Sequence, residues 1–133
     1  MMNDALSTIM TKEVITVTSN DDLQKVREVL LSKRLHHIPV VDNDRLVGII
    51  TTIDLWKMNK CYTEYSGIKV SDMMTKKMAT LSPDDKIGVA AELFLENRFH
   101  AVPIVEGERL VGIVSSFDVM SYNFKKAYPR QFD

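Results

Sequence analysis

The feature that most constrains the fold is an internal repeat. When Met10 is aligned with Met74, an offset of 64 residues, the segment 10–55 lies over the segment 74–119 without a gap. The pentapeptide RLVGI then falls on itself, and RLHHIPVV falls on RFHAVPIV, so all three histidines occupy one kind of segment. A unit of this size cannot bury both faces of a sheet alone. The chain must therefore fold as two similar halves that pack together.

Each copy predicts the order strand, helix, strand, strand, helix. Short segments with alternating apolar residues at 14–17 and 78–81 predict the first strands. HIPVV and RLVGII, joined by DND, predict a tight hairpin, and AVPIV and RLVGIV, joined by EGE, predict its counterpart. Gly48 and Gly112, which match in the repeat, are expected to permit the close approach of a strand or a ligand. The fold class is therefore α/β (α+β), with two tandem β-α-β-β-α repeats.

Hydroxyl residues three positions before an aspartate mark the expected helix starts, because this is the spacing of an N-cap and its capping box. Two pairs that match in the repeat have this spacing at the expected helix starts: Thr18 with Ser82, and Thr51 with Ser115. Pro83 would then occupy the first position of its helix, where proline is favoured. We expect the first helix of each copy to begin at Thr18 or Ser82 and the second at Thr51 or Ser115.

The composition excludes several classes of function. A formal net charge of −1 and a pI near 6.3 argue against a broad basic surface for nucleic acid or anionic lipid. The single cysteine, Cys61, cannot form an intramolecular disulfide, which fits a reducing compartment. The N-terminus does not resemble a signal peptide, and no apolar run approaches the ~20 residues that span a bilayer. We expect a cytoplasmic protein with no membrane partner.

Catalytic and metal-binding motifs are missing from the sequence. It contains no Gly-x-Ser-x-Gly elbow, P-loop or His-Glu-x-x-His pair, and no cysteine-histidine signature. His36 and His37 are adjacent in a predicted strand and would point to opposite faces, which disfavours a shared metal. We therefore expect a protein that is not an enzyme, requires no cofactor and binds no metal.

The paired HIPVV and AVPIV, RLVGI, and TTID and SSFD segments, repeated in tandem, resemble a pair of cystathionine β-synthase (CBS) domains, an arrangement called a Bateman module. The resemblance extends from about residue 6 to residue 120. It implies CBS repeats at 6–56 and 70–122, with a connecting segment at 57–69 and a C-terminal tail at 123–133. It further implies that the repeats pack sheet to sheet about a pseudo-twofold axis. Two clefts between them would bind adenosine derivatives.

The same resemblance implies which residues bind the ligand. Asp54 and Asp118 would accept hydrogen bonds from both ribose hydroxyls, and Thr51 and Ser115 would lie at the sugar or phosphate. These residues have a structural interpretation as well, because a hydroxyl N-cap and an acid in the first turn stabilise a helix start. The remaining candidates lie beside the base or along the wall of the cleft: Thr16, Leu35, His36, His37, Thr80, Phe99, His100 and Ala101.

The histidines leave two interpretations open. His36, His37 and His100 could contact phosphate, or their imidazoles could pack against a neighbouring strand and bond a carbonyl. In the second repeat, Ala101 stands where the first repeat has His37. We therefore expect the two clefts to be inequivalent.

Three functions agree with these features. The first is a sensor that binds AMP, ADP, ATP or S-adenosylmethionine and signals by altered association with its own copy, as a homodimer, or with an unidentified protein partner. The second is a structural scaffold for dimerisation and protein interaction that binds no small molecule. The third is a pH sensor, because histidines near one interface titrate close to neutrality.

Overall fold

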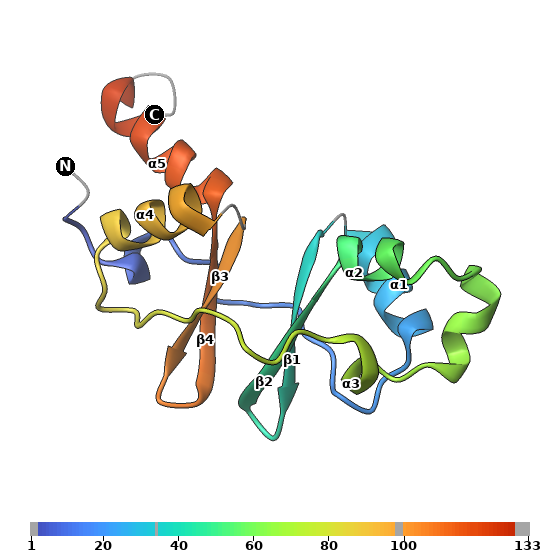
Figure 1. Cartoon of the computed structure of the whole chain (residues 1–133). Coiled ribbons are helices and arrows are strands. Elements are labelled where there is room, and N and C mark those ends of the chain that lie inside the picture. Colours follow the sequence, from blue (N-terminus) through green and yellow to red (C-terminus); the bar gives the residue numbers. More distant parts are fainter. Residues whose placement is uncertain (1–2, 34, 98–99, 130–133) are drawn as a thin grey trace. The chain divides into compact units, whose positions relative to one another are not determined.

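The computed structural model describes residues 3–33, 35–97 and 100–129, and they form two compact units (Figure 1). One unit is the continuous stretch Ile15–Met78. The other combines the chain up to Val14 with the chain from Ala79 onward. Each unit therefore contains the helix and hairpin of one repeat together with a leading segment, 6–14 or 70–78, that belongs in sequence to the other repeat.

The continuous unit is built around one antiparallel hairpin and its helices. Its elements are α1 (Leu23–Lys33), β1 (His37–Asp42), β2 (Arg45–Thr51), α2 (Thr52–Met58), the 3-10 helix η2 (Tyr62–Gly67) and α3 (Val70–Met73). Strand β1 pairs with β2 from His37 opposite Thr51 to Asp42 opposite Arg45. The turn is tight because Asn43 and Asp44 both take positive φ, 51° and 67°, as in the favoured two-residue hairpin turns.

The discontinuous unit repeats this design. Its elements are the 3-10 helix η1 (Leu6–Thr8), α4 (Ile87–Asn97), β3 (Ala101–Glu106), β4 (Arg109–Ser115) and α5 (Ser116–Ala127). The hairpin runs from Ala101 opposite Ser115 to Glu106 opposite Arg109, and Gly107 supplies a positive φ of 63° at its turn. Helices α4 and α5 contact each other beside this hairpin (Figure 1). The predicted α+β class and both predicted hairpins are confirmed.

The predicted first strands and first-helix starts are wrong in detail. The first strands are reduced to single bridging residues, Val17 beside Val40 and Leu81 beside Ile104. Helix α1 begins at Leu23, not after Thr18, and α4 begins at Ile87, after a turn that contains Pro83. Thr18 and Ser82 donate their backbone N–H groups to Asp21 and Asp85, both at 2.8 Å, and so close turns that precede the helices.

Contacts with the leading segments, and with the residues just before them, explain why α1 and α4 begin late. Leu23 donates its backbone N–H to the carbonyl of Ile68 at 2.9 Å, and Val70 donates to the carbonyl of Asp21 at 2.8 Å. In the other unit, Ile87 donates to Asp4 at 2.9 Å and Leu6 donates to Asp85 at 2.8 Å. These bonds hold the chain extended just before each helix, so the first turn forms only beyond them.

The leading segments also complete the two hydrophobic cores. Leu6 and Val70, which match at the repeat offset, are both 0% exposed and belong to different core clusters. Met10 and Met74 also match, and each lies against the hairpin glycine of its unit: a Cβ on Gly48 would stand 2.6 Å from the Met74 sulfur, and one on Gly112 would stand 2.7 Å from the Met10 sulfur. The expectation that these glycines permit close approach is confirmed, and the approaching group is a chain segment.

The connecting segment 57–69 contains regular structure and part of a core. Residues 62–67 form η2, and Tyr65 is 9% exposed within the core of its unit. The ring of Tyr62 lies 4.7 Å from the guanidinium carbon of Arg27 on α1. Tyr65 therefore serves packing, whereas Tyr62 is 55% exposed and contacts Arg27 at the surface.

Candidate functional site

Asp54 is fixed at the start of α2 by a reciprocal capping box. Its backbone N–H donates to Thr51 Oγ1 at 3.2 Å, and the Thr51 N–H donates to Asp54 Oδ2 at 2.8 Å. Thr51 has extended backbone angles, φ −129° and ψ 166°, as an N-cap residue requires. Among the described residues, the box uses only Oδ2 of Asp54. The half-buried carboxylate is therefore held in one position while Oδ1 remains able to accept hydrogen bonds.

Asp118 is held in the same way at the start of α5. Its backbone N–H donates to Ser115 Oγ at 3.1 Å, and the Ser115 N–H donates to Asp118 Oδ2 at 2.8 Å. Both predicted helix starts at Thr51 and Ser115 are confirmed, together with their caps. Each unit thus presents one carboxylate that a capping box holds at a helix N-terminus.

The segments that carry the histidines lie beside these helix starts. His37 is opposite Thr51 in the hairpin, and the carbonyl of His36 accepts from the N–H of Thr52 at 3.1 Å. The side chain of His36 is exposed, whereas that of His37 is half-buried and has a polar or ring partner. The backbone therefore brings His36, His37, Thr51 and Asp54 into one group.

The second unit forms the matching group. Ala101 is opposite Ser115, and the carbonyl of His100 accepts from the N–H of Ser116 at 2.8 Å. His100 is exposed and Ala101 is 8% exposed. An apolar methyl in this unit replaces the imidazole of the other. The predicted site residue Phe99 lies outside the described residues.

Thr16 and Thr80 lie next to the residues that bridge the first strand of each hairpin. The N–H of Val17 donates to the carbonyl of Pro39 at 3.2 Å, and the N–H of Leu81 donates to that of Pro103 at 3.1 Å. Both threonines are exposed. Another candidate, Leu35, packs against the core of its unit.

A cavity of about 510 Å³ lies against α5, with Asp118 in its lining. Its other lining residues are Thr8 and Ile9 from the N-terminal segment and Ser121, Tyr122, Lys125 and Lys126 from α5. Of these residues, only Asp118 is a predicted site residue. The α5 residues follow Asp118 at three, four, seven and eight positions, so helical periodicity could have indicated them. No local signal points to Thr8 and Ile9, which reach the cavity only through the tertiary fold.

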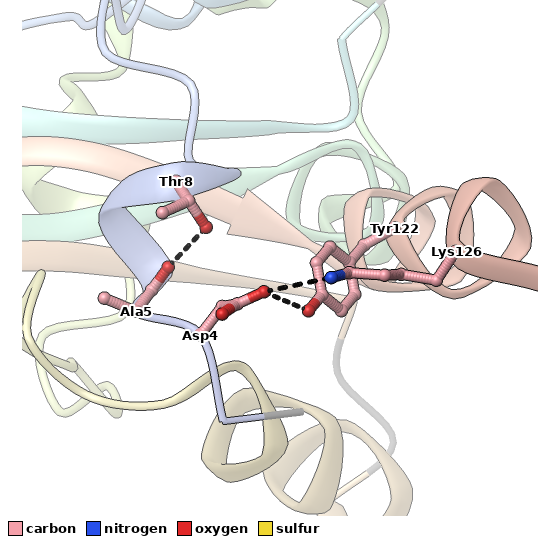
Figure 2. A network of polar contacts seen from close by, with 5 residues as sticks. All are labelled: Asp4, Ala5, Thr8, Tyr122 and Lys126. Carbon is pink, nitrogen blue, oxygen red and sulfur yellow. Dashed lines mark hydrogen bonds and ion pairs between the residues drawn. The ribbon is translucent and has the colours of Figure 1, made fainter. Parts of the chain in front are cut away.

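A polar network ties the N-terminal segment to the same helix (Figure 2). The Tyr122 hydroxyl donates to Asp4, and Lys126 Nζ lies 3.7 Å from Asp4 Oδ2. The hydrogen bond from Tyr122, helped by the charge of Lys126, lowers the pKa of the Asp4 carboxyl, and the same bond raises the pKa of Tyr122. Thr8 Oγ1 donates to the carbonyl of Ala5 at 2.7 Å, which closes the 3-10 turn beside this network.

Within the described ranges, no group of three or more His, Cys, Asp or Glu residues could hold a metal ion. Across the same ranges, no helix has the length and apolarity required to cross a membrane.

The family model for the CBS domain matches residues 6–55 and 70–125. The chain belongs to the CBS domain family. The resemblance of its motifs to a CBS pair is thereby confirmed. The two CBS matches carry the two capping boxes, one in each.

Relatives of this CBS chain include an enzyme and two solved structures. This chain is 37% identical to homoserine O-acetyltransferase of Methanococcus vannielii over 113 residues. The aligned region covers 84% of this chain and 23% of that protein. Protein MJ1225 from Methanocaldococcus jannaschii has a similar structure, with a TM-score of 0.86 and 27% identity over 92% of this chain and 48% of that one. The CBS domain pair of protein MJ0100, solved with 5′-methylthioadenosine and S-adenosyl-L-methionine, gives a TM-score of 0.80 and 28% identity over 93% and 98%.

This CBS chain spans between 23% and 49% of the length of the curated relatives that it matches first. The likeness therefore concerns only part of the length of each of these relatives.

Proposed function

We propose that this CBS pair is a non-catalytic regulatory module that binds an adenosine-containing ligand of the AMP, ADP, ATP or S-adenosylmethionine class. The observation that carries the proposal is the pair of capping boxes, which hold Asp54 and Asp118 at equivalent helix starts. A similar CBS pair, that of protein MJ0100, was solved with two adenosine derivatives, and this supports the same ligand class here.

A fixed carboxylate suits a ribose for a simple chemical reason. An ionised carboxylate only accepts hydrogen bonds, whereas the two ribose hydroxyls can both donate. Hydrogen bonds to a charged group contribute about 1.5–3 kcal/mol each, more than those between neutral groups. Because the capping box already orders the carboxylate, little side-chain entropy is lost when a sugar binds to Asp54 or Asp118.

The neighbouring residues have proposed roles in the same site. Thr16 and Thr80 lie beside the base, and the exposed His36 and His100 contact the sugar-phosphate side of the ligand. The bond from Thr52 to the carbonyl of His36 supports this role, because it fixes the histidine segment at the helix start where the ribose would bind.

Signalling through association is supported by apolar side chains that the chain leaves in solvent. On α5, Phe117, Met120 and Phe124 are 67%, 61% and 47% exposed and recur at three and four residues. On α2, Ile53 and Trp56 are 55% and 81% exposed. We propose that these faces form a homodimer contact whose strength depends on the bound ligand. They equally favour a second function, a dimerisation scaffold without a ligand.

Calorimetric titration separates the two functions. Wild-type protein is titrated with AMP, ADP, ATP and S-adenosylmethionine, and its association state is measured by sedimentation with and without each ligand. Asp54→Ala and Asp118→Ala are each expected to remove one site, and the double variant to bind none. Asp21→Ala is the matched control, because Asp21 also closes a backbone turn but belongs to neither capping box. Absence of heat with every ligand would leave the scaffold as the function.

A further inference from the structure

Two methionines occupy equivalent positions against the hairpin glycines. A Cβ on Gly48 would stand 2.6 Å from the sulfur of Met74, and a Cβ on Gly112 would stand 2.7 Å from the sulfur of Met10. Each thioether therefore fills the space that its glycine leaves, and no room remains for another heavy atom between them. Both methionines are half-buried, so part of each residue stays in contact with solvent.

The leading segments pair with their hairpins at the residue that follows each methionine. Thr75 and Ile49 exchange two backbone hydrogen bonds, at 2.8 Å and 3.0 Å. Thr11 and Ile113 exchange two more, at 2.9 Å and 3.0 Å. Each pair is an isolated bridge outside the named strands. Because no ladder of further bonds surrounds such a bridge, it depends on the packing of the methionine beside it.

Both methionines stand close to the points where the chain passes from one unit to the other. The first stretch of the discontinuous unit ends at Val14, and the continuous unit ends at Met78. Met10 and Met74 each lie four residues before these points. A loss of packing at either methionine would therefore lengthen the unanchored chain that joins the units.

We propose that Met10 and Met74 are oxidation sites at which hydrogen peroxide releases the leading segments from their hairpins. The sulfur lone pair attacks one oxygen of the peroxide and the O–O bond breaks. The leaving hydroxide takes the proton of the transferred oxygen and becomes water. The thioether is thus oxidised by two electrons to a sulfoxide and the peroxide is reduced. Because sulfoxide reductases restore methionine, the change is reversible.

The sulfoxide oxygen has no favourable position while the sulfur stays in its contact. Between the sulfur and the glycine it meets the same lack of space as a Cβ. Turned toward the interior, it would lie among apolar side chains, since Met74 and Met10 each pack against the core cluster of their unit, and a polar group buried without a hydrogen-bond partner is unfavourable. Turned toward solvent, it draws the sulfur away from the glycine. In each case the isolated bridge loses its support.

The experiment treats the full chain with hydrogen peroxide, locates each sulfoxide by mass spectrometry and follows amide hydrogen exchange by NMR. All proteins carry Cys61→Ser, because the exposed thiol of Cys61 also reacts with peroxide. We expect exchange to accelerate about tenfold at the bridging amides as the bridges open locally. These are the amides of Thr11, Ile49, Thr75 and Ile113.

Leucine variants provide the matched controls. Met10→Leu combined with Met74→Leu nearly conserves side-chain volume and removes both sulfurs, so peroxide should no longer change exchange at the bridging amides. Met120→Leu should respond to peroxide as the parent protein does, because Met120 is 61% exposed on α5.

Glutamine variants test the two sites one at a time and without an oxidant. Met74→Gln places a polar group beside Gly48 and should accelerate exchange at Ile49 and Thr75 alone. Met10→Gln should act only on the bridge of the discontinuous unit. Acceleration in both units by either variant would indicate a general loss of stability and contradict the proposal.

The peroxide results decide the proposal as well. Sulfoxide at Met10 and Met74 with unchanged exchange at the bridging amides would overturn it. So would a folded chain in which Met120 is oxidised while Met10 and Met74 are not. Equal acceleration in the parent protein and in the double leucine variant would assign the effect to another residue.

Discussion

Replacement of Gly48 by alanine tests the packing of the leading segment 70–78 on its hairpin. A Cβ at this position would stand 2.6 Å and 2.9 Å from the sulfur and Cγ of Met74, and 3.0 Å from the carbonyl oxygen of Thr75. Normal contacts between such atoms lie at about 3.5–4.0 Å. The methionine side chain can move, but the Thr75 carbonyl is held because it accepts from the N–H of Ile49 at 3.0 Å.

The change in the free energy of unfolding follows from the contacts with Met74 and Thr75. Overpacking of a tight site costs about 1–3 kcal/mol, and the loss of unfolded-chain entropy from Gly to Ala returns about 0.4–1 kcal/mol. We expect Gly48→Ala to lower the free energy of unfolding by about 1–2 kcal/mol. Gly112→Ala should behave alike, because its Cβ would stand 2.7 Å from the Met10 sulfur and 3.1 Å from the carbonyl oxygen of Thr11.

Urea denaturation followed by circular dichroism measures the change. Gly67→Ala is the control, since a Cβ there meets nothing within 4 Å, and it should be neutral or slightly stabilising. The double variant Gly48→Ala, Met74→Ala should lose less free energy of unfolding than the sum of the losses of the two single variants, because the shortened side chain at position 74 removes the closest clash. If Gly48→Ala is as harmless as Gly67→Ala, the leading segment does not pack on the hairpin as described.

Three further predictions concern other contacts. Thr51→Ala should lower the free energy of unfolding by about 1 kcal/mol because α2 loses its N-cap, and Thr51→Ser should restore most of it; equal urea midpoints for all three proteins would contradict the capping role. Hydrogen bonds from the hydroxyl of Ser19, and to a lesser extent from its backbone N–H, lower the pKa of the Asp42 carboxyl below its ordinary value of 3.8. The ionised carboxylate therefore stabilises the fold above pH 3.8, and this stabilisation is lost as the pH falls through the lowered pKa. Ser19→Ala should raise that pKa toward 3.8 in an NMR titration, and an unmoved pKa would refute the assignment. Trp56→Lys should weaken self-association in sedimentation without lowering the free energy of unfolding of the monomer, because the side chain is 81% exposed; unchanged association would exclude α2 from the contact.

Features that depend on short-range sequence could be predicted. The capping boxes at Thr51 and Ser115 need only a hydroxyl, an acid three residues later and a strand before them, and the structure has both boxes. The hairpins could be predicted from the sequence as well, because turn residues such as Asn43 and Asp44 tolerate positive φ. The repeat then extended each local prediction from one half to the other.

Features set by long-range contacts could not be predicted. Thr18 has the spacing of an N-cap, yet α1 begins at Leu23 because the N–H of Leu23 is bonded to Ile68, far away in the sequence. The cavity beside Asp118 was missed for the same reason, since the N-terminal 3-10 helix supplies part of its wall. How the two units pack, the boundaries assigned to the repeats, and the ligand roles of the site residues stay predictions.

The discontinuous unit has a consequence for synthesis of the chain on the ribosome. Leu6 leaves the ribosome long before Ser115, at which the β3–β4 hairpin of its core cluster ends. The inner stretch Ile15–Met78, in contrast, contains every member of its own core cluster, from Val17 to Met74. Because domains fold as their residues become available, the inner unit completes first. The apolar side chain of Leu6 remains without its core partners until the β3–β4 hairpin has emerged.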